Sequence, residues 1–493
     1  MCTTIEKIGR QIDTAEDNND IGKLLELSKL CQSNLDIANE GDRVILKFYE
    51  ANCFSAIAKT KSSDADYLWG WNNDEKISEI LALRQAVSEQ GFPNIDPLFQ
   101  CKILTNLGNN LNHLGRFVEA LKYWDKVLAI KPNFAMALGN KGVGLVSYAR
   151  SLYDHGHAGI LVENAKINLE KIISGGALWD SGSQPDAKEY FSQYLEYSKN
   201  ILSDIEYNFE FDLNQYSLGD TDNEVKYRQW CLNNRLFLSP LNDVISQSAA
   251  AQDVIHLPSH TYGIEESPRF PNYYNLLKQE YVTARHMLYE GMTGNNQHPS
   301  DNKVLLDGFD GVQFGYRAEQ LKIAYRLAYS IFDKIALFLN DYFSVGLSAA
   351  SVSFRIIWGK HNKESKAFEL HPCFLDCQNW PLRGLYYLSK DLFDKDFLDV
   401  SLPDSHELAK LRNLTEHRFL SLQIYPASVQ NTETHTYITT SDFEKKTLRI
   451  LSMAREAMIY LPLAMYREEE LRSQNKDDEY LSFPMPSTPI ERM

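Results

Sequence analysis

The sequence predicts an all-helical protein in two parts, a solenoid of helical hairpins followed by a helical bundle. A 34-residue unit at 101–134 has the spacing of a helix-turn-helix repeat. Apolar residues recur with the helical period over long later stretches, including 273–291, 316–343 and 443–471. The 493 residues are 44% hydrophobic and 12% aromatic, which suits two to four folded domains rather than disorder.

The 34-residue unit carries small and apolar residues at fixed positions. Counted from Cys101, the positions 4, 7, 8, 11, 20, 24 and 32 hold Leu104, Leu107, Gly108, Leu111, Ala120, Trp124 and Pro132. Gly115 ends the first helix of the unit, and Pro132 closes the second. This pattern resembles the tetratricopeptide repeat.

The repeat continues in weaker form on both sides. One unit further on, Leu138, Gly142 and Leu145 occupy positions 4, 8 and 11, before an extra stretch at 153–159 and a helix at 160–173. Because each unit of a solenoid buries its face against a neighbour, we expect degenerate hairpins across 1–205, including helices at 5–15, 18–31 and 42–59. Their concave surface is expected to bind a peptide, a partner protein or the chain's own C-terminal half. The alternative is a purely structural scaffold.

The remaining chain divides into three parts. Residues 206–225 have no clear period, and the segment 206–250 is predicted to connect the two domains. Residues 251–475 are predicted to form the helical bundle, with helices at 273–291, 316–343, 382–393, 406–424 and 443–471. Residues 476–493 are acidic and proline-containing, and are expected to be a disordered tail.

Composition limits the function. The formal net charge of −16 argues against bulk, salt-driven nucleic-acid binding but permits a local pocket with a few cations. No apolar run reaches the length of a membrane span and no leader is visible, so a soluble, cytoplasmic protein without a membrane partner is expected. The chain lacks a glycine-rich phosphate loop, which disfavours nucleotide transfer, and no cofactor is predicted.

The cysteines do not suggest a disulfide framework or a metal centre. Their number, seven, is odd, and most are widely scattered. His371, Cys373 and Cys377 lie close together but offer three ligands at a spacing that is not standard for zinc. We therefore predict no metal site and interpret the cysteines as small buried side chains.

The residues with the clearest chemical potential are Arg412 and His417. An arginine can hold a phosphate, and a histidine can move a proton near neutral pH. Similar spacings occur at Arg150–His155 and Arg355–His361, so spacing alone is not specific. Arg412 differs because a polar residue, Asn413, follows it within a segment that is predicted to be helical.

A helical projection of 406–424 separates two faces. The apolar arc holds Leu408, Leu411, Leu414, Phe419 and Leu422, and the opposite face holds Arg412, Asn413, Glu416 and His417. Two residues do not fit this division: the charged Arg418 falls on the apolar arc, and the apolar Leu420 falls on the polar face. The alternative to a site is an ordinary solvated face, on which Arg412 and Glu416 pair at i, i+4.

Several short sequence segments around this motif resemble those of the HEPN superfamily of helical-bundle RNases and their inactive relatives. The resemblance covers about 230–475 and rests on 234–238 (Asn-Arg-Leu-Phe-Leu), 279–281 with 284–285, 382–386 (Leu-Arg-Gly-Leu-Tyr) and 389–393 (Ser-Lys-Asp-Leu-Phe). These segments are similar to those of a bacterial branch of the superfamily in which a HEPN domain follows tetratricopeptide-like repeats.

The resemblance implies a metal-independent endoribonuclease that acts as a homodimer or higher oligomer, with the site shared between two copies. Arg412 would bind the scissile phosphate of an RNA substrate, His417 would be general acid or base, and Asn413 would orient one of these groups. The products would be a 2′,3′-cyclic phosphate and a 5′-hydroxyl.

The resemblance also bears on control and biological role. Some HEPN toxins carry a modifiable tyrosine two residues after the histidine, where this chain has Phe419. Control is therefore expected through the repeats, in phage defence or as a toxin, with a protein trigger or partner on the repeat domain. The alternative is a non-catalytic module that binds proteins or nucleotides.

Overall fold

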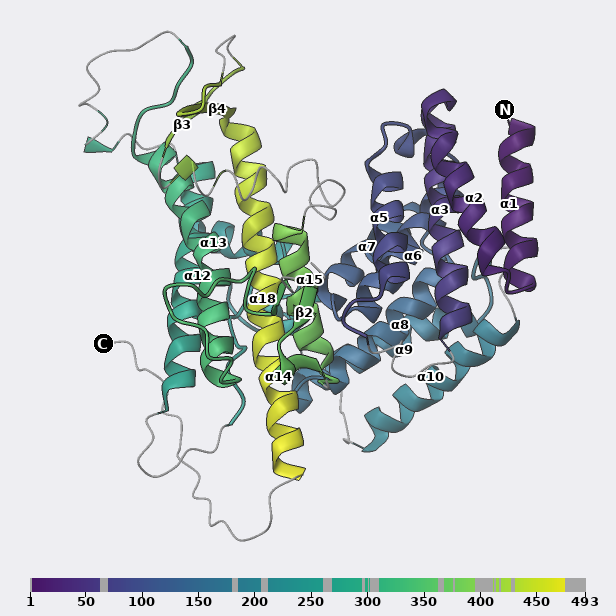
Figure 1. Ribbon diagram of the computed structural model, residues 1–493. Coiled ribbons are helices and arrows are strands. Elements are labelled where there is room, and N and C mark those ends of the chain that lie inside the picture. The colour runs from purple at the N-terminus through teal and green to yellow at the C-terminus, as the bar shows by residue number, and fades with distance from the viewer. Residues whose placement is uncertain are drawn as a thin grey trace.

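The computed structural model is helical over most of the residues that it describes (Figure 1). These are residues 2–62, 70–179, 185–204, 212–259, 268–294, 298–299, 301, 310–361, 368–375, 377–394, 411, 414–415, 418–426 and 431–474. Within these ranges, no helix has an apolar stretch of the length that a bilayer requires. The all-helical class predicted from sequence is confirmed.

The N-terminal part is a series of helices in which chain neighbours lie side by side. Its elements are α1 (Cys2–Asp17), α2 (Ile21–Ser33), η1 (Leu35–Ile37), α3 (Glu40–Lys61), α5 (Asp74–Ser88), η2 (Phe92–Asn94), α6 (Pro97–His113), α7 (Phe117–Ile130), α8 (Ala135–Arg150), α9 (His155–Ile173) and α10 (Pro185–Asp204). The helices expected at 5–15, 18–31, 42–59 and 160–173 are confirmed.

Short polar side chains begin many of these helices. Asp20, Asn39, Asn73 and Asp154 each accept a hydrogen bond from a backbone N–H of the first turn. Such a cap satisfies one of the N–H groups that have no partner within the helix. The boundaries of the repeats are therefore set locally.

The small residues of the 101–134 unit lie where helices approach closely. A Cβ on Gly108 would stand 2.7 Å from Nε1 of Trp124, so α6 and α7 meet there without room for a larger residue. Gly115 has φ +85°, a backbone conformation that favours glycine, and it makes the turn between the two helices. The sequence predicts that Gly115 ends the first helix of the unit, and the structure agrees.

The C-terminal part is a bundle in which α12 and α13 pack together and α18 packs against both (Figure 1). Its helices are α12 (Arg269–Thr293), α13 (Tyr316–Tyr342), α14 (Pro372–Leu375), α15 (Trp380–Phe393) and α18 (Thr440–Gln474). Two small sheets accompany them: β1 (Gly359–His361) pairs antiparallel with β2 (Phe368–Leu370), and β3 (Phe419–Gln423) pairs parallel with β4 (His435–Thr439).

The helix predicted over 406–424 is wrong in its second half, because Phe419–Gln423 is the strand β3. A strand exposes alternate residues, and here Phe419 is exposed, Leu420 buried, Ser421 half-buried and Leu422 buried. The apolar spacing was compatible with a helix, but the local structure follows the period of two.

The segment after the repeats is folded rather than extended. It contains α11 (Asp222–Asn233), η3 (Pro240–Asp243) and η4 (Ser248–Ala250). The buried guanidinium of Arg455, on α18, donates to the backbone oxygens of Phe237 at 2.6 Å and Ser239 at 2.8 Å. It also pairs with Asp243 at 2.6 Å, whose other carboxylate oxygen accepts from Tyr148 of α8. This segment thus joins the bundle to the repeats.

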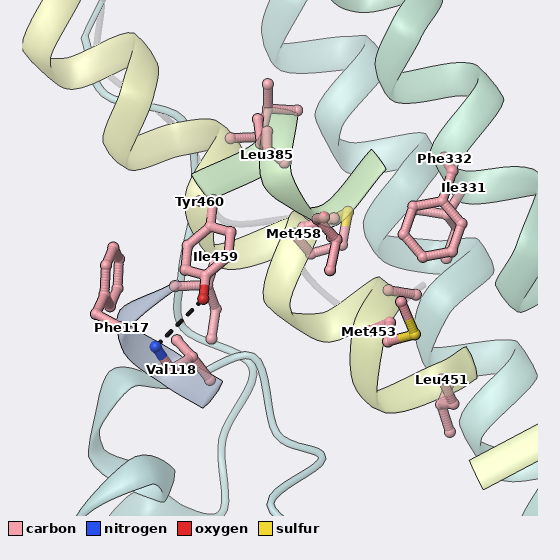
Figure 2. Packing of buried hydrophobic residues seen from close by; sticks show 14 of the residues in the cluster. Phe117, Val118, Ile331, Phe332, Leu385, Leu451, Met453, Met458, Ile459 and Tyr460 are labelled. Atoms are coloured by element: carbon pink, nitrogen blue, oxygen red, sulfur yellow. Dashed lines mark hydrogen bonds between the residues drawn. The ribbon is translucent and has the colours of Figure 1, made fainter. Parts of the chain in front are cut away.

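One hydrophobic core runs through both parts of the chain. Figure 2 shows Phe117 and Val118 of α7 beside Tyr460 of α18. The Tyr460 hydroxyl accepts a hydrogen bond from the Val118 N–H at 3.2 Å. The Phe117 ring lies 4.5 Å from that of Trp380 and 4.7 Å from that of Tyr460, between centroids. The repeats and the bundle therefore share aromatic packing.

Charged residues are also buried where the two parts meet. Five of them, each at most 4% exposed, form what we call the interface ion cluster: Arg84, Arg116, Glu119, Asp391 and Glu456. Arg84 Nη1 lies 2.6 Å from Asp391 Oδ1. Arg116 pairs with Asp391, Glu119 and Glu456, the last at 2.9 Å. The arginines belong to the repeats, whereas Asp391 and Glu456 belong to α15 and α18.

The cluster holds two of its carboxylates, those of Asp391 and Glu119, in the ionised form. Burial by itself raises the pKa of Asp391, but the guanidinium groups of Arg84 and Arg116 outweigh burial and lower it. Likewise, burial opposes ionisation of Glu119, and Arg116 and Arg449 lower its pKa. The buried arginines and the buried carboxylates therefore each need the other to remain charged away from water.

Replacing Asp391 with alanine should leave Arg84 and Arg116 buried without their shared carboxylate. We expect the free energy of unfolding to fall by about 3–5 kcal/mol, as for a broken buried pair. Urea denaturation followed by circular dichroism measures this loss. The control is Glu196→Ala, which removes an exposed pair with Lys199 and should cost less than about 1 kcal/mol. Equal, small losses in both variants would contradict the role assigned to the cluster.

Candidate active site

The segment that carries the arginine–histidine motif is anchored in the bundle core. Leu411 and Leu414 are 4% and 3% exposed and belong to the shared core. Leu411, Leu414 and Thr415 are helical, and the Arg418 N–H donates to the Leu414 oxygen at 3.2 Å. The i, i+3 spacing of two buried leucines agrees with the apolar arc predicted for this part of the motif.

The three predicted site residues, Arg412, Asn413 and His417, lie outside the described residues. Their geometry is therefore not part of the described structure, and their roles stay predictions. The surrounding residues define the place in the fold: the motif is bounded by the buried Leu411 on one side and by Arg418, just before β3, on the other.

The strand β3 explains the two residues that did not fit the helical projection. Arg418 is exposed immediately before the strand, and its Nη1 donates to the backbone oxygen of Glu433 at 2.6 Å. Leu420 is 6% exposed because it points inward from the strand. Both positions conflict with a helix and agree with a turn into a strand.

A third segment lies beside β3. The Gln313 N–H donates to the Leu422 oxygen at 2.7 Å, and the Ile424 N–H donates to the Gly311 oxygen at 2.9 Å. The Thr440 hydroxyl, at the start of α18, donates to the Gln423 oxygen at 3.2 Å. The small sheet is thus fixed to the ends of both α13 and α18, next to the motif segment.

The outward face of this sheet carries polar and aromatic side chains. In the parallel register Phe419 pairs with His435, and Ser421 pairs with Tyr437. Ser421 Oγ lies 2.8 Å from His435 Nε2. The His435 ring is stacked on Tyr437 with centroids 4.2 Å apart, and Phe419 is 73% exposed. We name these four residues the β3–β4 face.

The other arginine–histidine spacings occupy different settings. Arg150 ends α8 and His155 begins α9, both exposed. Asp154 caps α9, and burial lowers the pKa of His157 in the same turn. These residues form a connection between repeat helices. In the second pair, Arg355 is exposed in a turn, and the side chain of His361 is outside the described residues.

The residues that were considered for zinc have separate environments. Cys373 is exposed. Cys377 Sγ lies 3.1 Å from Glu468 Oε1, and burial raises the pKa of the Cys377 thiol. Within the described ranges, no group of three or more His, Cys, Asp or Glu side chains is arranged to hold a metal ion.

Comparison with known families identifies the class of the C-terminal part. Residues 261–468 match the family described as LA2681-like HEPN, and this region is a HEPN domain. The match covers α12, α13, α15, β3, β4 and most of α18, together with the motif segment. HEPN domains are associated with nuclease or nucleotide-related functions. No curated protein and no solved structure shows a significant match to the chain.

Several of the sequence segments that resemble the HEPN superfamily contain residues with clear structural roles. Tyr281 and Arg285 of α12 both donate to the Leu236 oxygen, at 2.8 and 3.0 Å. Arg285 also pairs with Asp253 at 2.8 Å. Asp391 belongs to the interface ion cluster. These segments therefore contribute to holding the bundle against its neighbours.

The sequence interpretation missed the β3–β4 face. Its signals were present: Leu420 and Leu422 flank the polar Ser421 with the period of a strand, and 435–439 are rich in β-branched and aromatic residues, which strands favour. The apolar spacing at 408–422 also fits a helix, which places Ser421 on a helical face and does not bring it to His435 and Tyr437.

Truncating Leu414 to alanine should loosen the motif segment. We expect an unfolding free energy lower by about 2–5 kcal/mol, because the deleted side chain leaves a cavity in the core. Chemical denaturation provides the measurement. Ile424→Ala is the control, since its side chain is 69% exposed and its loss should change stability by less than about 0.5 kcal/mol. If Leu414→Ala is as stable as the control, the anchoring is not as described.

Proposed function

We propose that this protein is a metal-independent endoribonuclease of the HEPN type. The observation that carries the proposal is that the HEPN match at 261–468 contains Arg412, Asn413 and His417. These residues supply an anion-binding guanidinium, an amide and a group that titrates near neutral pH. That set is sufficient for phosphodiester cleavage by the neighbouring ribose hydroxyl.

In the proposed reaction, the ribose 2′-oxygen attacks the adjacent phosphorus and the 5′-oxygen of the next nucleotide leaves. Arg412 binds the scissile phosphate and stabilises the charge that develops on its oxygens. His417 removes the 2′-proton or protonates the departing 5′-oxygen. Asn413 orients one of these groups by hydrogen bonding. The products are a 2′,3′-cyclic phosphate and a 5′-hydroxyl.

We further propose that two copies of the motif share one site in a homodimer. One histidine cannot remove and deliver a proton in the same concerted step, whereas two copies offer two. A symmetric pair of HEPN domains brings two equivalent motifs together across one axis. The proposed setting is the cytoplasm, in phage defence or as a toxin.

The repeats offer a place for the proposed protein trigger. A groove of about 760 Å³ is lined by residues of α1, α3, α6 and α8. Phe48 and Phe99 contribute apolar surface, and Asn52 and Asn106 contribute amides. The hydroxyl of Thr105 is buried there without a hydrogen-bond partner in the described part of the chain. A partner segment could supply the missing bond.

The same helix links this groove to the bundle. The last turn of α6 accepts two hydrogen bonds from α15: Trp380 Nε1 donates to the Asn112 oxygen at 2.7 Å, and Arg383 donates to the His113 oxygen. Binding in the groove therefore acts on a helix that contacts the HEPN domain directly. This continuity supports control by the repeats.

His417→Ala is expected to lower RNA cleavage by about 100-fold or more, the usual contribution of a general acid–base group. Labelled RNA incubated with purified protein and excess chelator gives the rate, and bacteria induced for each variant give total-RNA integrity. Cleavage that survives chelator and is lost in the variant supports the proposal.

A matched control exists within the same chain. His155→Ala removes the histidine of the equally spaced Arg150–His155 pair and should leave cleavage unchanged. If both histidine variants cleave like the wild type, the assignment of the site is wrong. If the folded wild type leaves RNA intact, with and without phage infection, a non-catalytic binding module replaces the proposal.

Asn106→Arg is expected to block the groove, because the longer side chain enters the space that a partner would use. Cells that carry this variant should no longer fragment RNA in response to the infection that activates the wild type. Total RNA after infection is the readout, and circular dichroism melting verifies the fold. Glu196→Arg, on an exposed position of α10, is the control. An unimpaired response in Asn106→Arg would exclude this groove as the trigger site.

A further inference from the structure

Directly after the proposed catalytic motif in the chain comes a partly exposed surface whose chemistry differs from that of a packing face: Phe419 is exposed, and Ser421, His435 and Tyr437 are half-buried. The strand β3 sends Leu420 and Leu422 inward, where they are 6% and 0% exposed. The β3–β4 face, on the other side, carries Phe419, Ser421, His435 and Tyr437. Rings and hydrogen-bonding groups thus point outward while the aliphatic residues of β3 point inward.

The rings are arranged as a platform. His435 and Tyr437 stack at 4.2 Å with 24° between their planes, and Phe419 lies 6.0 Å from His435. Phe419 and Ser421 pair in register with His435 and Tyr437, and paired residues of neighbouring strands share a face. The hydrogen bond between Ser421 and His435 holds the central ring in place.

We propose that the β3–β4 face binds unpaired bases of single-stranded RNA. Aromatic side chains on an open sheet are the surfaces on which splayed bases stack, and such stacking needs no bulk positive charge. That feature suits a chain with a net charge of −16. The exposed guanidinium of Arg418, at the edge of the face, is placed to meet a phosphate of the same strand.

Position along the chain links this face to cleavage. Arg418 directly follows His417, and Phe419 is the next residue. A strand whose bases stack on Phe419 and Tyr437 would therefore pass the motif segment. The inference rests on the proposed RNase function for its choice of RNA, and it adds the subsite that positions the nucleotides flanking the cut.

A second copy of the chain is the competing occupant, and the surface chemistry argues against it. The cores of stable interfaces between copies are more apolar than the average surface. The β3–β4 face instead combines rings with a serine hydroxyl, an imidazole and a phenol. We therefore favour RNA and make the dimer an outcome of the test.

The experiment measures binding separately from cleavage. Full-length His417→Ala serves as the parent, so that the RNA stays intact, and fluorescence anisotropy follows a labelled, unstructured 12-nucleotide RNA at near-physiological salt. Adding Phe419→Ala or Tyr437→Ala should raise Kd roughly 5- to 100-fold each, the range for loss of one stacked base. Phe419→Trp should retain affinity, because the larger ring still stacks.

Tyr197→Ala, an exposed tyrosine of α10 that is 42% exposed, is the matched control and should bind like the parent. Melting by circular dichroism confirms that each variant is folded. The inference is overturned if the parent does not bind, or if Phe419→Ala binds like the parent. It is also overturned if the variants change the oligomeric state in analytical ultracentrifugation while the RNA affinity stays the same.

The two proposals fail in different ways. RNA bound through Phe419 by a wild-type protein that never cleaves would refute the ribonuclease and keep the binding face. Cleavage that depends on His417, together with RNA affinity that does not depend on Phe419 or Tyr437, would refute the face and keep the ribonuclease.

Discussion

The position of the HEPN domain against the repeats depends on the contact of Asp391 with Arg84 and Arg116. Removing such charges from water costs several kcal/mol per ion, and that cost is recovered only when the geometry is satisfied. Here both carboxylate oxygens of Asp391 are used: Arg84 donates to both, and Arg116 also donates to Oδ2. Arg116 continues to Glu456 of α18. An apolar contact tolerates sliding, whereas this set of pairs fits one register. Three helices, α5, α15 and α18, are thereby aligned around the α6–α7 turn.

This arrangement gives a structural role to residues of the sequence segments that resemble the HEPN superfamily. Asp391 and Arg383 face the repeats, and Tyr281 and Arg285 hold the Leu236 backbone. A polar residue within a segment that resembles the family suggests a site, but burial and pairing here assign these residues to the contact between the two parts of the chain. The strands β3 and β4, which follow the motif segment in the chain, lie at the start of α18 (Figure 1), whereas Glu456 of the interface ion cluster lies near the middle of that helix.

Much of the helical architecture could be predicted because its signals are local. The period of 3.6 and the small residue Gly108 are readable without knowing the fold, and the helices α12, α13 and α15 lie close to their expected places. The strand β3 could not be separated from a helix, since leucines at 411, 414 and 422 fit the helical period and the alternation over 419–422 fits the period of a strand. The interface ion cluster was beyond prediction, because Arg116 and Glu456 are brought together only by the tertiary fold. Of the site, the sequence supplied residue types and spacing, while Arg412, Asn413 and His417 lie outside the described residues.

The α6–α7 turn and α15 meet at two glycines, Gly115 and Gly384, and this contact has a mechanical consequence. A Cβ on either residue would overlap backbone atoms of the other segment, so the α6–α7 turn and α15 touch main chain to main chain. Packed proteins yield mostly in their side-chain layers, where rotamers adjust and absorb small displacements. At this crossing the glycines provide no such layer. The junction is therefore stiff, and a shift of α6 is transmitted to α15 as a shift of comparable size rather than being lost in repacking.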